Sequence, residues 1–251
     1  MAKYILKRLL LLIPVLIGVS ILVFVVMHVF TADPTSIILG QHATADQIEK
    51  LRMQLGLKDP LYVQYWNFFK NAIRGNLGNS LITQTSVTKE ILSRFPATIE
   101  LALAAIIIAS VFGILIGIIS AVKQNSIIDY LSMVFALIGV SMPIFWLGLI
   151  LIVLFAVQLH LVPVSGRIQL GLEPVNITGF YILDSILTGN MEALKSALSH
   201  MILPAAALGS YSTAIIARMT RSTMLEVIRQ DYIRTARAKG LFERAVIMKH
   251  A

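Results

Sequence analysis

Four long stretches without a charged side chain constrain this sequence most: residues 9–32, 101–122, 130–166 and 196–217. A helix needs about 20 mainly apolar residues to cross a bilayer, because the hydrocarbon core is about 30 Å thick and each residue rises about 1.5 Å. All four stretches meet this requirement, and residues 9–30 alone contain 17 Leu, Ile, Val or Phe. We therefore expect an all-α integral membrane protein with four transmembrane helices, at about 9–30, 99–122, 130–159 and 197–219.

The composition excludes several other classes of protein. Charged residues make up 14% of the 251 residues, against about 25% in an average soluble domain. The chain has no cysteine, so disulfides, Cys-ligated metals and cysteine nucleophiles are excluded. His28, His160 and His200 do not have the spacing of metal ligands. We therefore predict that the chain binds no metal and no cofactor.

The first apolar stretch resembles a signal peptide, because Lys3, Lys7 and Arg8 precede it. Its apolar run is longer than the 7–15 residues that are typical of a signal sequence. We therefore interpret residues 1–32 as an uncleaved N-terminal anchor helix. Positive residues favour the cytoplasmic side, and eight of them lie in residues 218–251. Four spans with a cytoplasmic N-terminus place residues 1–8, 123–129 and 218–251 all on the cytoplasmic side.

The third uncharged stretch has 37 residues, from 130 to 166. Two spans would need about 40 residues and a turn. One long helix that is interrupted at Ser141, Met142 and Pro143 fits better, because proline removes a backbone hydrogen bond and bends a helix. Such a break either serves packing alone or lines a transport pathway, and the sequence leaves both possibilities open.

The segment from 33 to 96 is too long for a structureless connection, and we expect an external loop with short helices. Residues 44–47 match a capping box at the start of a helix, and Gly56 lies where a C-terminal cap belongs. Pro60 is expected to open a second short helix. A third short helix is expected to lead to Pro96, which would then open the second span.

Two features near the external face have more than one interpretation. Tyr62, Tyr65, Trp66 and Phe69 form an aromatic segment that could lie on the outer leaflet or provide a platform for an external partner. Glu100 stands at the edge of the second span. Its carboxylate could lie at the depth of the lipid headgroups or face a pore.

The basic C-terminal segment has the pattern of a helix, a glycine and a second helix. Asp231 is expected to cap a helix that runs to Lys239, and Gly240 is expected to end it with a positive φ. A second helical piece contains Val246. A continuous lipid-binding stripe does not fit, because the glycine interrupts it. A nucleic-acid partner does not fit either, because no stacking or base-reading pattern accompanies the positive charge.

These residues resemble a known element. Residues 231–241 are similar to the EAA loop of ABC importer permeases, in the form used by the dipeptide/oligopeptide/nickel family. The general motif is Glu-Ala-Ala-x-x-x-Gly. Arg234, Thr235 and Ala236 stand in its first three places and Gly240 in its last. The glutamate is absent, but the peptide/nickel branch typically has Arg-Thr-Ala there.

Other segments resemble the same family in order along the chain, namely residues 43–65, 75–80, 94–101 and 141–148. The resemblance, to the B-type subunit, implies a six-helix permease fold with two spans beyond Ala251. Residues 1–251 would then form one permease domain that is incomplete at its C-terminus. It would consist of the anchor helix (1–32), the external loop (33–96) and the core permease region (97–251). We expect this segment to insert into the membrane but not to transport alone. Candidates for faces that pack on the missing spans are Ser110, Gly113, Gly117, Gly209, Ser210 and Ser212.

The resemblance also implies the function and the partners. The chain would be the transmembrane pathway subunit of an ATP-driven bacterial importer, moving peptides, nickel or related small solutes across the inner membrane by alternating access. Its partners would be a second, homologous permease subunit, two cytoplasmic ATP-binding subunits, an external solute-binding protein and membrane lipid. The chain has no Gly-x-x-x-x-Gly-Lys-Ser/Thr phosphate-binding loop. We therefore expect a transport subunit that is not an enzyme, with ATP hydrolysis on the partner subunits. The residues implied in coupling to the ATPase subunit are Asp231, Tyr232, Arg234, Thr235, Ala236, Arg237, Ala238, Lys239, Gly240 and Leu241.

An ATP-independent secondary transporter or channel subunit is the alternative function. Such a protein would need charged side chains inside the membrane for ion coupling. The four apolar spans contain no such side chain except Glu100, at the edge of the second span. A membrane enzyme would need a cluster of His, Asp and Glu within the spans, and the sequence has none there.

Overall fold

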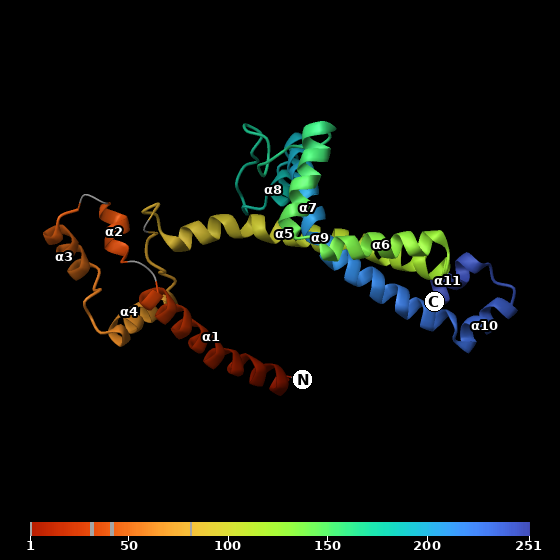
Figure 1. Cartoon of the computed structure of the whole chain (residues 1–251), viewed down its shortest axis with the longest axis horizontal. Helices are drawn as coiled ribbons and strands as arrows, with labels where there is room; N and C mark the ends of the chain where they lie inside the picture. The colour runs from red at the N-terminus through yellow and green to blue at the C-terminus, as the bar shows by residue number, and fades with distance from the viewer. Residues whose placement is uncertain (1, 31–32, 41–42, 81) are drawn as a thin grey trace. The chain divides into compact units, whose positions relative to one another are not determined.

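The computed structural model describes residues 2–30, 33–40, 43–80 and 82–251 (Figure 1). The regular structure of these residues is helical, and they add one isolated β-bridge between Asn79 and Ser86. The chain divides into two compact units, Met1–Ser93 and Arg94–Ala251, and the boundary falls inside a helix. The elements are α1 (Ala2–Phe30), α2 (Pro34–Leu39), α3 (Ala45–Gln54), α4 (Leu61–Ile73), α5 (Val87–Val122), α6 (Ile127–Ser141), α7 (Ile144–Leu151), the π-helix η1 (Ile152–Gln158), α8 (Tyr181–Leu187), α9 (Met191–Ile228), α10 (Asp231–Ala238) and α11 (Glu243–His250).

Three helices of the described chain are long and apolar enough to cross a membrane. They are α1 over Lys3–His28, α5 and α9. A fourth span is present if α6 and the α7–η1 segment are counted together, since the two are joined by a short break. The prediction of an all-α membrane protein is confirmed, with four spans when the broken pair counts as one.

In the first unit, aromatic side chains attach α4 to α1. The Tyr65 hydroxyl lies 2.8 Å from the Ser20 hydroxyl, and the Tyr65 ring contacts Phe24 edge-on. The Phe24 ring in turn stacks on His28 at 3.8 Å between centroids. The predicted aromatic segment is therefore partly used for packing inside this chain, while Tyr62 on the same helix remains 76% exposed.

The predicted capping box of α3 is confirmed. The Gln47 amide donates to the Thr44 hydroxyl, and the Thr44 amide donates to the Gln47 side chain at 3.0 Å. Gly56 has a φ of +67° after the end of the helix, and Pro60 stands directly before α4. Local turn chemistry was sufficient to place these elements.

The expected start of the second span at Pro96 is wrong. One continuous helix, α5, begins at Val87, and Pro96 lies inside it. A proline removes only one hydrogen bond from a helix. The helix continues on both sides of Pro96, so this local loss does not end the element. Residues 87–95, predicted as a separate short helix, form the first turns of α5.

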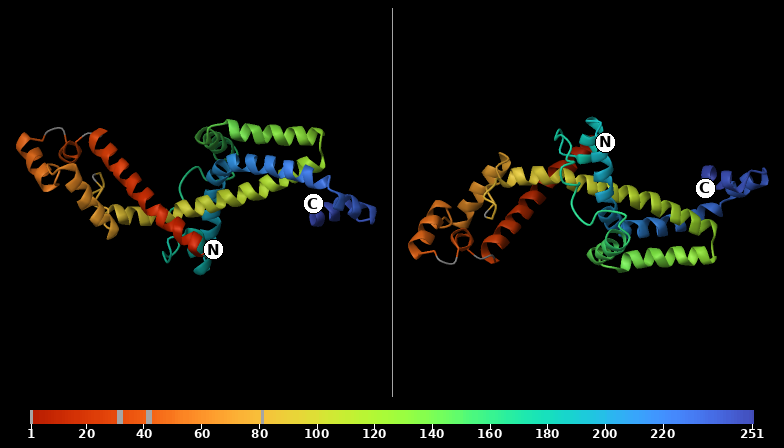
Figure 2. Two further views of the ribbon diagram at one scale, coloured as in Figure 1. Left: turned by 90° about the horizontal axis from the view of Figure 1, so that it is seen from below. Right: turned by 90° about the horizontal axis from the view of Figure 1, so that it is seen from above.

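In the second unit, α9 packs against α6, α7 and α8 (Figure 2). Helix α9 also approaches α5 closely, at positions where one of the two helices has a glycine. A Cβ on Gly117 would lie 2.5 Å from the Cβ of Thr220, and one on Gly209 would lie 2.9 Å from the Ala105 carbonyl oxygen. The expectation that Gly113, Gly117 and Gly209 face missing spans is therefore wrong. Small residues allow two helices to approach closely, and here the two helices belong to this chain.

The predicted break in the third uncharged stretch is present at Met142 and Pro143. The axes of Ile127–Ser141 and Ile144–Gln158 differ by 112°, far more than a simple kink. Pro143 disfavours a helical conformation at the preceding residue, and Met142 is extended, with φ −86° and ψ 137°. The third stretch is therefore interrupted where predicted, and it forms two helices at a sharp angle.

Candidate functional site

A helical hairpin follows the end of α9 and contains the residues implied in coupling. Gln230 is extended and precedes α10, so the expected N-cap at Asp231 is wrong and Asp231 is the first helical residue. Its carboxylate still lies in the first turn, where the helix dipole favours a negative charge. The link from α9 is hydrogen-bonded, since the Gln230 amide donates to the Val227 carbonyl at 3.0 Å and the Ile233 amide to the Gln230 carbonyl at 3.1 Å.

Gly240 forms the turn between α10 and α11. Its φ is +77°, as predicted, a conformation that glycine adopts without strain on a Cβ. Across this turn, Arg237 donates two hydrogen bonds to Glu243, at 3.0 and 2.7 Å. The hydrogen bonds from Arg237 lower the pKa of the Glu243 carboxyl below its ordinary value. The turn is therefore closed by both backbone conformation and an ion pair.

The two helices of the hairpin share a small apolar core. Ile233 and Val246 are fully buried, Ala236 is buried beside them, and Val227 from the end of α9 packs against this cluster. Because Val227 belongs to α9, the hairpin is fixed to the end of that helix by side-chain packing as well as by the backbone. A force on α10 would therefore be transmitted to α9.

The structure divides the predicted coupling residues into two groups. Ala236 is buried in the hairpin core, where it contacts this chain. The sequence reasoning missed Ile233, three residues before it, and Phe242, which is 86% exposed at the turn. The spacing of Ile233 and Ala236 is the signal that could have identified the buried face. The exposed residues are Asp231, Tyr232, Arg234, Thr235, Arg237, Ala238, Lys239, Gly240 and Leu241.

A buried ion pair lies near the same end of α9. Arg221 donates two hydrogen bonds to Asp129, Nε to Oδ1 and Nη2 to Oδ2, both at 2.7 Å. Asp129 also accepts from the Ser120 hydroxyl and, at 3.0 Å, from the Asn125 amide. The pair connects α9 with the start of α6 and the end of α5. Sequence reasoning missed it, because 92 residues separate the two charges.

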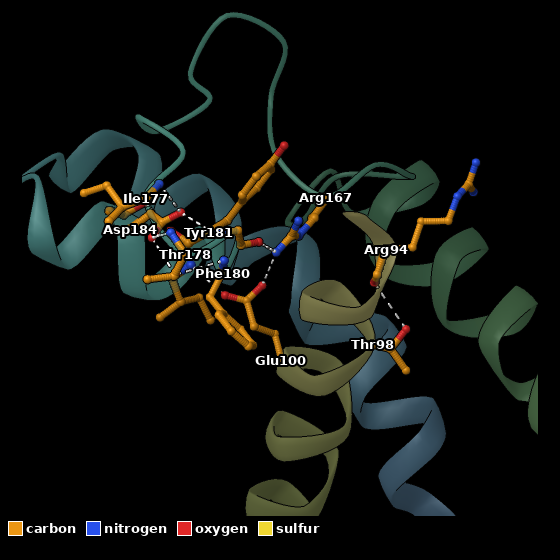
Figure 3. Close-up of polar contacts among 12 residues, drawn as sticks. Arg94, Thr98, Glu100, Arg167, Ile177, Thr178, Phe180, Tyr181 and Asp184 are labelled. Carbon is orange, nitrogen blue, oxygen red and sulfur yellow. Dashed lines mark hydrogen bonds and ion pairs between the residues drawn. The ribbon is translucent and has the colours of Figure 1, made fainter. Parts of the chain in front are cut away.

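A second ion pair holds the loop before α8 onto α5 (Figure 3). Arg167 donates to Glu100 and to the Gly179 carbonyl, each at 2.7 Å, and its guanidinium lies over the Tyr181 ring. The Ile182 amide donates to the other carboxylate oxygen of Glu100 at 2.8 Å. Glu100 is 7% exposed. In this chain, its carboxylate therefore binds protein partners rather than lipid headgroups or an open pore.

Asp184 organises the residues that precede α8 (Figure 3). Its buried carboxylate accepts hydrogen bonds from the amides of Ile177, Thr178 and Gly179, at 3.3, 2.9 and 3.0 Å, and from the Thr178 hydroxyl at 2.6 Å. Burial raises the pKa of this carboxyl, but the hydrogen bonds from Thr178 and its neighbours outweigh burial, and the net pKa is lowered.

The break between α6 and α7 faces α9 on one side. A Cβ on Gly139 would lie 3.6 Å from the Ser210 carbonyl oxygen, and one on Gly148 would lie 3.8 Å from the Ala207 Cβ. The Ser141 hydroxyl donates to the Leu137 carbonyl at 2.9 Å, so its hydrogen bond is made within the last turn of α6. The break thus has a packing role. Ser141 and Pro143 are exposed, and Met142 is partly exposed.

Within the parts of the chain that the structure describes, no group of three or more His, Asp or Glu side chains could hold a metal ion. The charged side chains described above instead form three ion pairs. Asp129–Arg221 joins two helices, Glu100–Arg167 joins a loop to α5, and Arg237–Glu243 closes the turn of the hairpin. Together with the membrane-spanning helices, these features define the class of the protein: a multi-pass α-helical membrane protein with a helical hairpin attached to α9.

Comparison with known proteins identifies the family. The family described as "Binding-protein-dependent transport system inner membrane component" matches residues 113–251. The N-terminal family described as "Binding-prot-dependent transport system membrane comp, N-term" matches residues 1–102. The chain therefore belongs to the inner membrane components of binding-protein-dependent transport systems.

Individual relatives agree with this assignment. The chain is 46% identical over 252 residues to the di/tripeptide transport system permease protein DppB of Pseudomonas aeruginosa, and 43% identical over 255 residues to the dipeptide transport system permease protein DppB of Escherichia coli K12. Both alignments cover 100% of this chain and 75% of the relative. The glutathione transport system permease protein GsiC of Escherichia coli O6:H1 is 40% identical over 250 residues, which cover 72% of that protein.

Proposed function

We propose that the chain is the transmembrane pathway subunit of an ATP-driven peptide importer in the bacterial inner membrane. The observation that carries this proposal is the α10–α11 hairpin, whose polar face is exposed while its core is fixed to α9 through Val227. A rigid attachment between a docking element and a spanning helix is what a transport subunit needs in order to be driven by another subunit. An ATP-independent secondary transporter would have no need for such an element.

The partners follow from this role. The transporter would contain two cytoplasmic ATP-binding subunits. One of them would dock on the exposed hairpin residues of this chain, with Tyr232, Leu241 and Phe242 as apolar contacts and Arg234 and Lys239 as cationic contacts. A second, homologous permease subunit would complete the pathway, and an external solute-binding protein would deliver the substrate. Residues 1–251 would form a single permease domain, with the N-terminus and the hairpin in the cytoplasm and the 33–96 segment outside.

Alternating access requires spans with two stable arrangements. The break at Ser141, Met142 and Pro143 is our candidate for the pathway, because helix breaks at membrane depth occur where they pack on protein or line a water-filled cavity. The side of the break that faces α9 is packed, which leaves the exposed side for the pathway.

The names of the relatives favour short peptides as the substrate class over nickel, since those relatives are named for dipeptide, di/tripeptide and glutathione transport. Each name describes that relative, and its extension to this chain is part of our proposal. The identity of the peptide would depend largely on the binding protein, which selects the solute before it reaches the membrane.

A reconstitution experiment tests the proposed function. The complete transporter, with its ATP-binding subunits and its binding protein, is placed in vesicles, and uptake of a labelled dipeptide is measured with ATP, without ATP and with a proton ionophore. We expect uptake that requires ATP and survives the ionophore. Uptake that persists without ATP and is abolished by the ionophore would support the secondary transporter instead.

A cross-linking experiment tests the docking surface separately. The chain has no cysteine, so a single cysteine can be placed at Tyr232 without background. We expect it to cross-link to an ATP-binding subunit that carries cysteines in its transmembrane-facing groove. A cysteine at Tyr62 of α4 is the matched control, and cross-linking from Tyr62 but not from Tyr232 would contradict the assignment.

A further inference from the structure

We propose that Asp129 and Arg221 are positioning residues that transmit the movement of the α9–α10–α11 segment to α5 and α6. This inference rests on the proposed function and adds to it the connection between the docking hairpin and the rest of the core. Neither residue belongs to the hairpin. Both lie where the ends of three helices meet.

The geometry places a single carboxylate at this junction. Asp129 lies in the first turn of α6, which Ser126 caps through its hydroxyl. One oxygen of Asp129 accepts from Ser120 of α5 and from Nε of Arg221, and the other accepts from the Asn125 amide and from Nη2 of Arg221. One side chain therefore connects α5, the turn between α5 and α6, α6 itself and α9.

Close packing beside the ion pair brings α5 and α9 together at the same level. A Cβ on Gly117 would meet Thr220, the residue before Arg221, at 2.5 Å, and the Ala217 carbonyl oxygen at 2.7 Å. The two helices are thus in close contact next to Arg221, which Asp129 binds. Movement of α9 at this point must either carry α5 and α6 with it or break the two hydrogen bonds from Arg221.

The hairpin side of the connection is equally direct. Arg221 lies on the last two turns of α9, and Val227, one and a half turns further along the same helix, packs on the hairpin core. A continuous helix bends little over this length, so a displacement of α10 moves Arg221 by a similar amount. The path from the docking surface to α6 therefore consists of one hydrophobic cluster, one helical segment and one ion pair.

The chemistry of the pair suits transmission better than an apolar contact would. Two parallel hydrogen bonds between a guanidinium and a carboxylate fix the relative orientation of their helices as well as the distance between them. Apolar side chains in contact can slide past one another at little cost. The Asp129 side chain is 3% exposed, so a partner lost from this site is not fully replaced by water.

Three substitutions separate transmission from simple stabilisation. Arg221→Met removes both hydrogen bonds, Asp129→Asn keeps the shape but removes the charge, and Arg221→Lys keeps the charge but cannot make the two-bonded contact. Arg218→Met is the matched control, because Arg218 lies one turn earlier on α9 with an exposed side chain. Each variant is studied in the complete transporter in vesicles. Peptide uptake and ATP hydrolysis are measured together, and the amount of assembled complex is determined.

We expect Arg221→Met and Asp129→Asn to lower the number of peptides imported per ATP hydrolysed by about tenfold. A change of this size is typical for substitutions of residues that lie between two coupled sites. ATP hydrolysis per assembled complex should remain, since the ATP site lies on the partner. Arg221→Lys should give an intermediate ratio, and Arg218→Met should match the wild type.

A purely structural role predicts a different pattern. Uptake, hydrolysis and assembly would then fall in parallel, and the number of peptides per ATP would not change, which would overturn the inference. If the Arg221→Met complex does not assemble, the number of peptides imported per ATP by Arg221→Lys distinguishes the two roles in the same way. Failure of the proposed function is distinguishable, because in that case the wild-type transporter itself would show no ATP-dependent uptake.

Discussion

Arg167 donates a hydrogen bond of 2.7 Å to Glu100, which lies 67 residues earlier in the chain, and so attaches the loop before α8 to the buried side of α5. The same guanidinium binds the Gly179 carbonyl. One side chain therefore fixes two points of the loop, residue 167 itself and Gly179, to α5. This arrangement explains how a segment rich in glycine and proline keeps a defined position beside a long helix.

Glu100→Gln should destabilise the protein, because it leaves the Arg167 charge without its counterion. Breaking a buried pair costs about 3–5 kcal/mol, and the partial exposure of Arg167 reduces our expectation to about 2 kcal/mol. The thermal unfolding of the purified protein in detergent measures this effect. Arg94→Met, which removes an exposed guanidinium from the same helix, is the control and should have little effect. Equal stability of both variants would contradict a structural role for the ion pair.

The Asp184 loop should lose stability in acid. The folded protein lowers the pKa of this carboxyl, so its contribution is fully present above its unfolded pKa of about 4 and decreases as the pH falls toward the folded value. At pH 7, the loop should resist limited proteolysis better in the wild type than in Asp184→Asn. This difference should shrink as the pH is lowered below about 4. A difference that stays constant or increases toward low pH would contradict this prediction.

Gly240→Val should uncouple transport from ATP hydrolysis while leaving membrane insertion intact. A Cβ at this position would meet no atom within 4 Å, so the cost comes from the positive φ, which is about 1–2 kcal/mol for an L-residue and highest for β-branched ones. Gly240→Asn is the control, because asparagine tolerates this conformation better. Peptide uptake and ATP hydrolysis at equal expression measure the effect. Normal uptake by the valine variant would show that the turn does not matter.

Gly117→Ala should destabilise the contact between α5 and α9. The added Cβ would lie 2.5 Å from the Thr220 Cβ and 2.7 Å from a backbone oxygen, so the helices must move apart. Overpacking of this kind typically costs about 1–3 kcal/mol. Gly148→Ala is the control on another helix that faces α9, since its Cβ would have an ordinary contact at 3.8 Å. Thermal unfolding should separate the two variants, and identical midpoints would show that the close approach is relieved without cost.

The proposed topology can be tested by cysteine labelling. Because the native chain has no cysteine, a cysteine at Tyr62 should react with an impermeant thiol reagent in whole cells. A cysteine at Gln230 should react only after the cells are permeabilised. The basis is the accumulation of Lys and Arg after residue 217, which favours the cytoplasmic side. The reverse pattern of labelling would place the hairpin outside and exclude its contact with an ATP-binding subunit.

The sequence predicted the features that depend on a few neighbouring residues. Uncharged stretches located the spans, a Ser/Thr-x-x-Gln type box located the start of α3, and the glycine pattern located the turn at Gly240. Each of these follows from the chemistry of a short segment, so no knowledge of the rest of the chain was needed. The break at Pro143 was also found, although its angle of 112° was not.

The sequence did not predict contacts between distant segments. Glu100 and Asp129 are isolated carboxylates when the chain is read in order, and their arginine partners lie 67 and 92 residues away. The glycines of α5 and α9 were assigned to missing spans, because sequence shows which faces are small but not which helix they meet. Pro96 was taken as a boundary, because its local effect was weighed without the helix on both sides of it.

The small size of the hairpin core has a consequence for the life of the protein in the cell. Burial of Ile233, Ala236 and Val246 supplies only a few kcal/mol, whereas ordering each residue of two short helices costs about 1–2 kcal/mol. The hairpin therefore depends on α9, and on any subunit that covers Tyr232 and Phe242, to remain folded. In the proposed topology, a permease that has not found its ATP-binding subunits would present a frayed hairpin with exposed apolar side chains to cytoplasmic proteases. Its lifetime would then report whether assembly had succeeded, and orphan subunits would be removed before they could accumulate in the membrane.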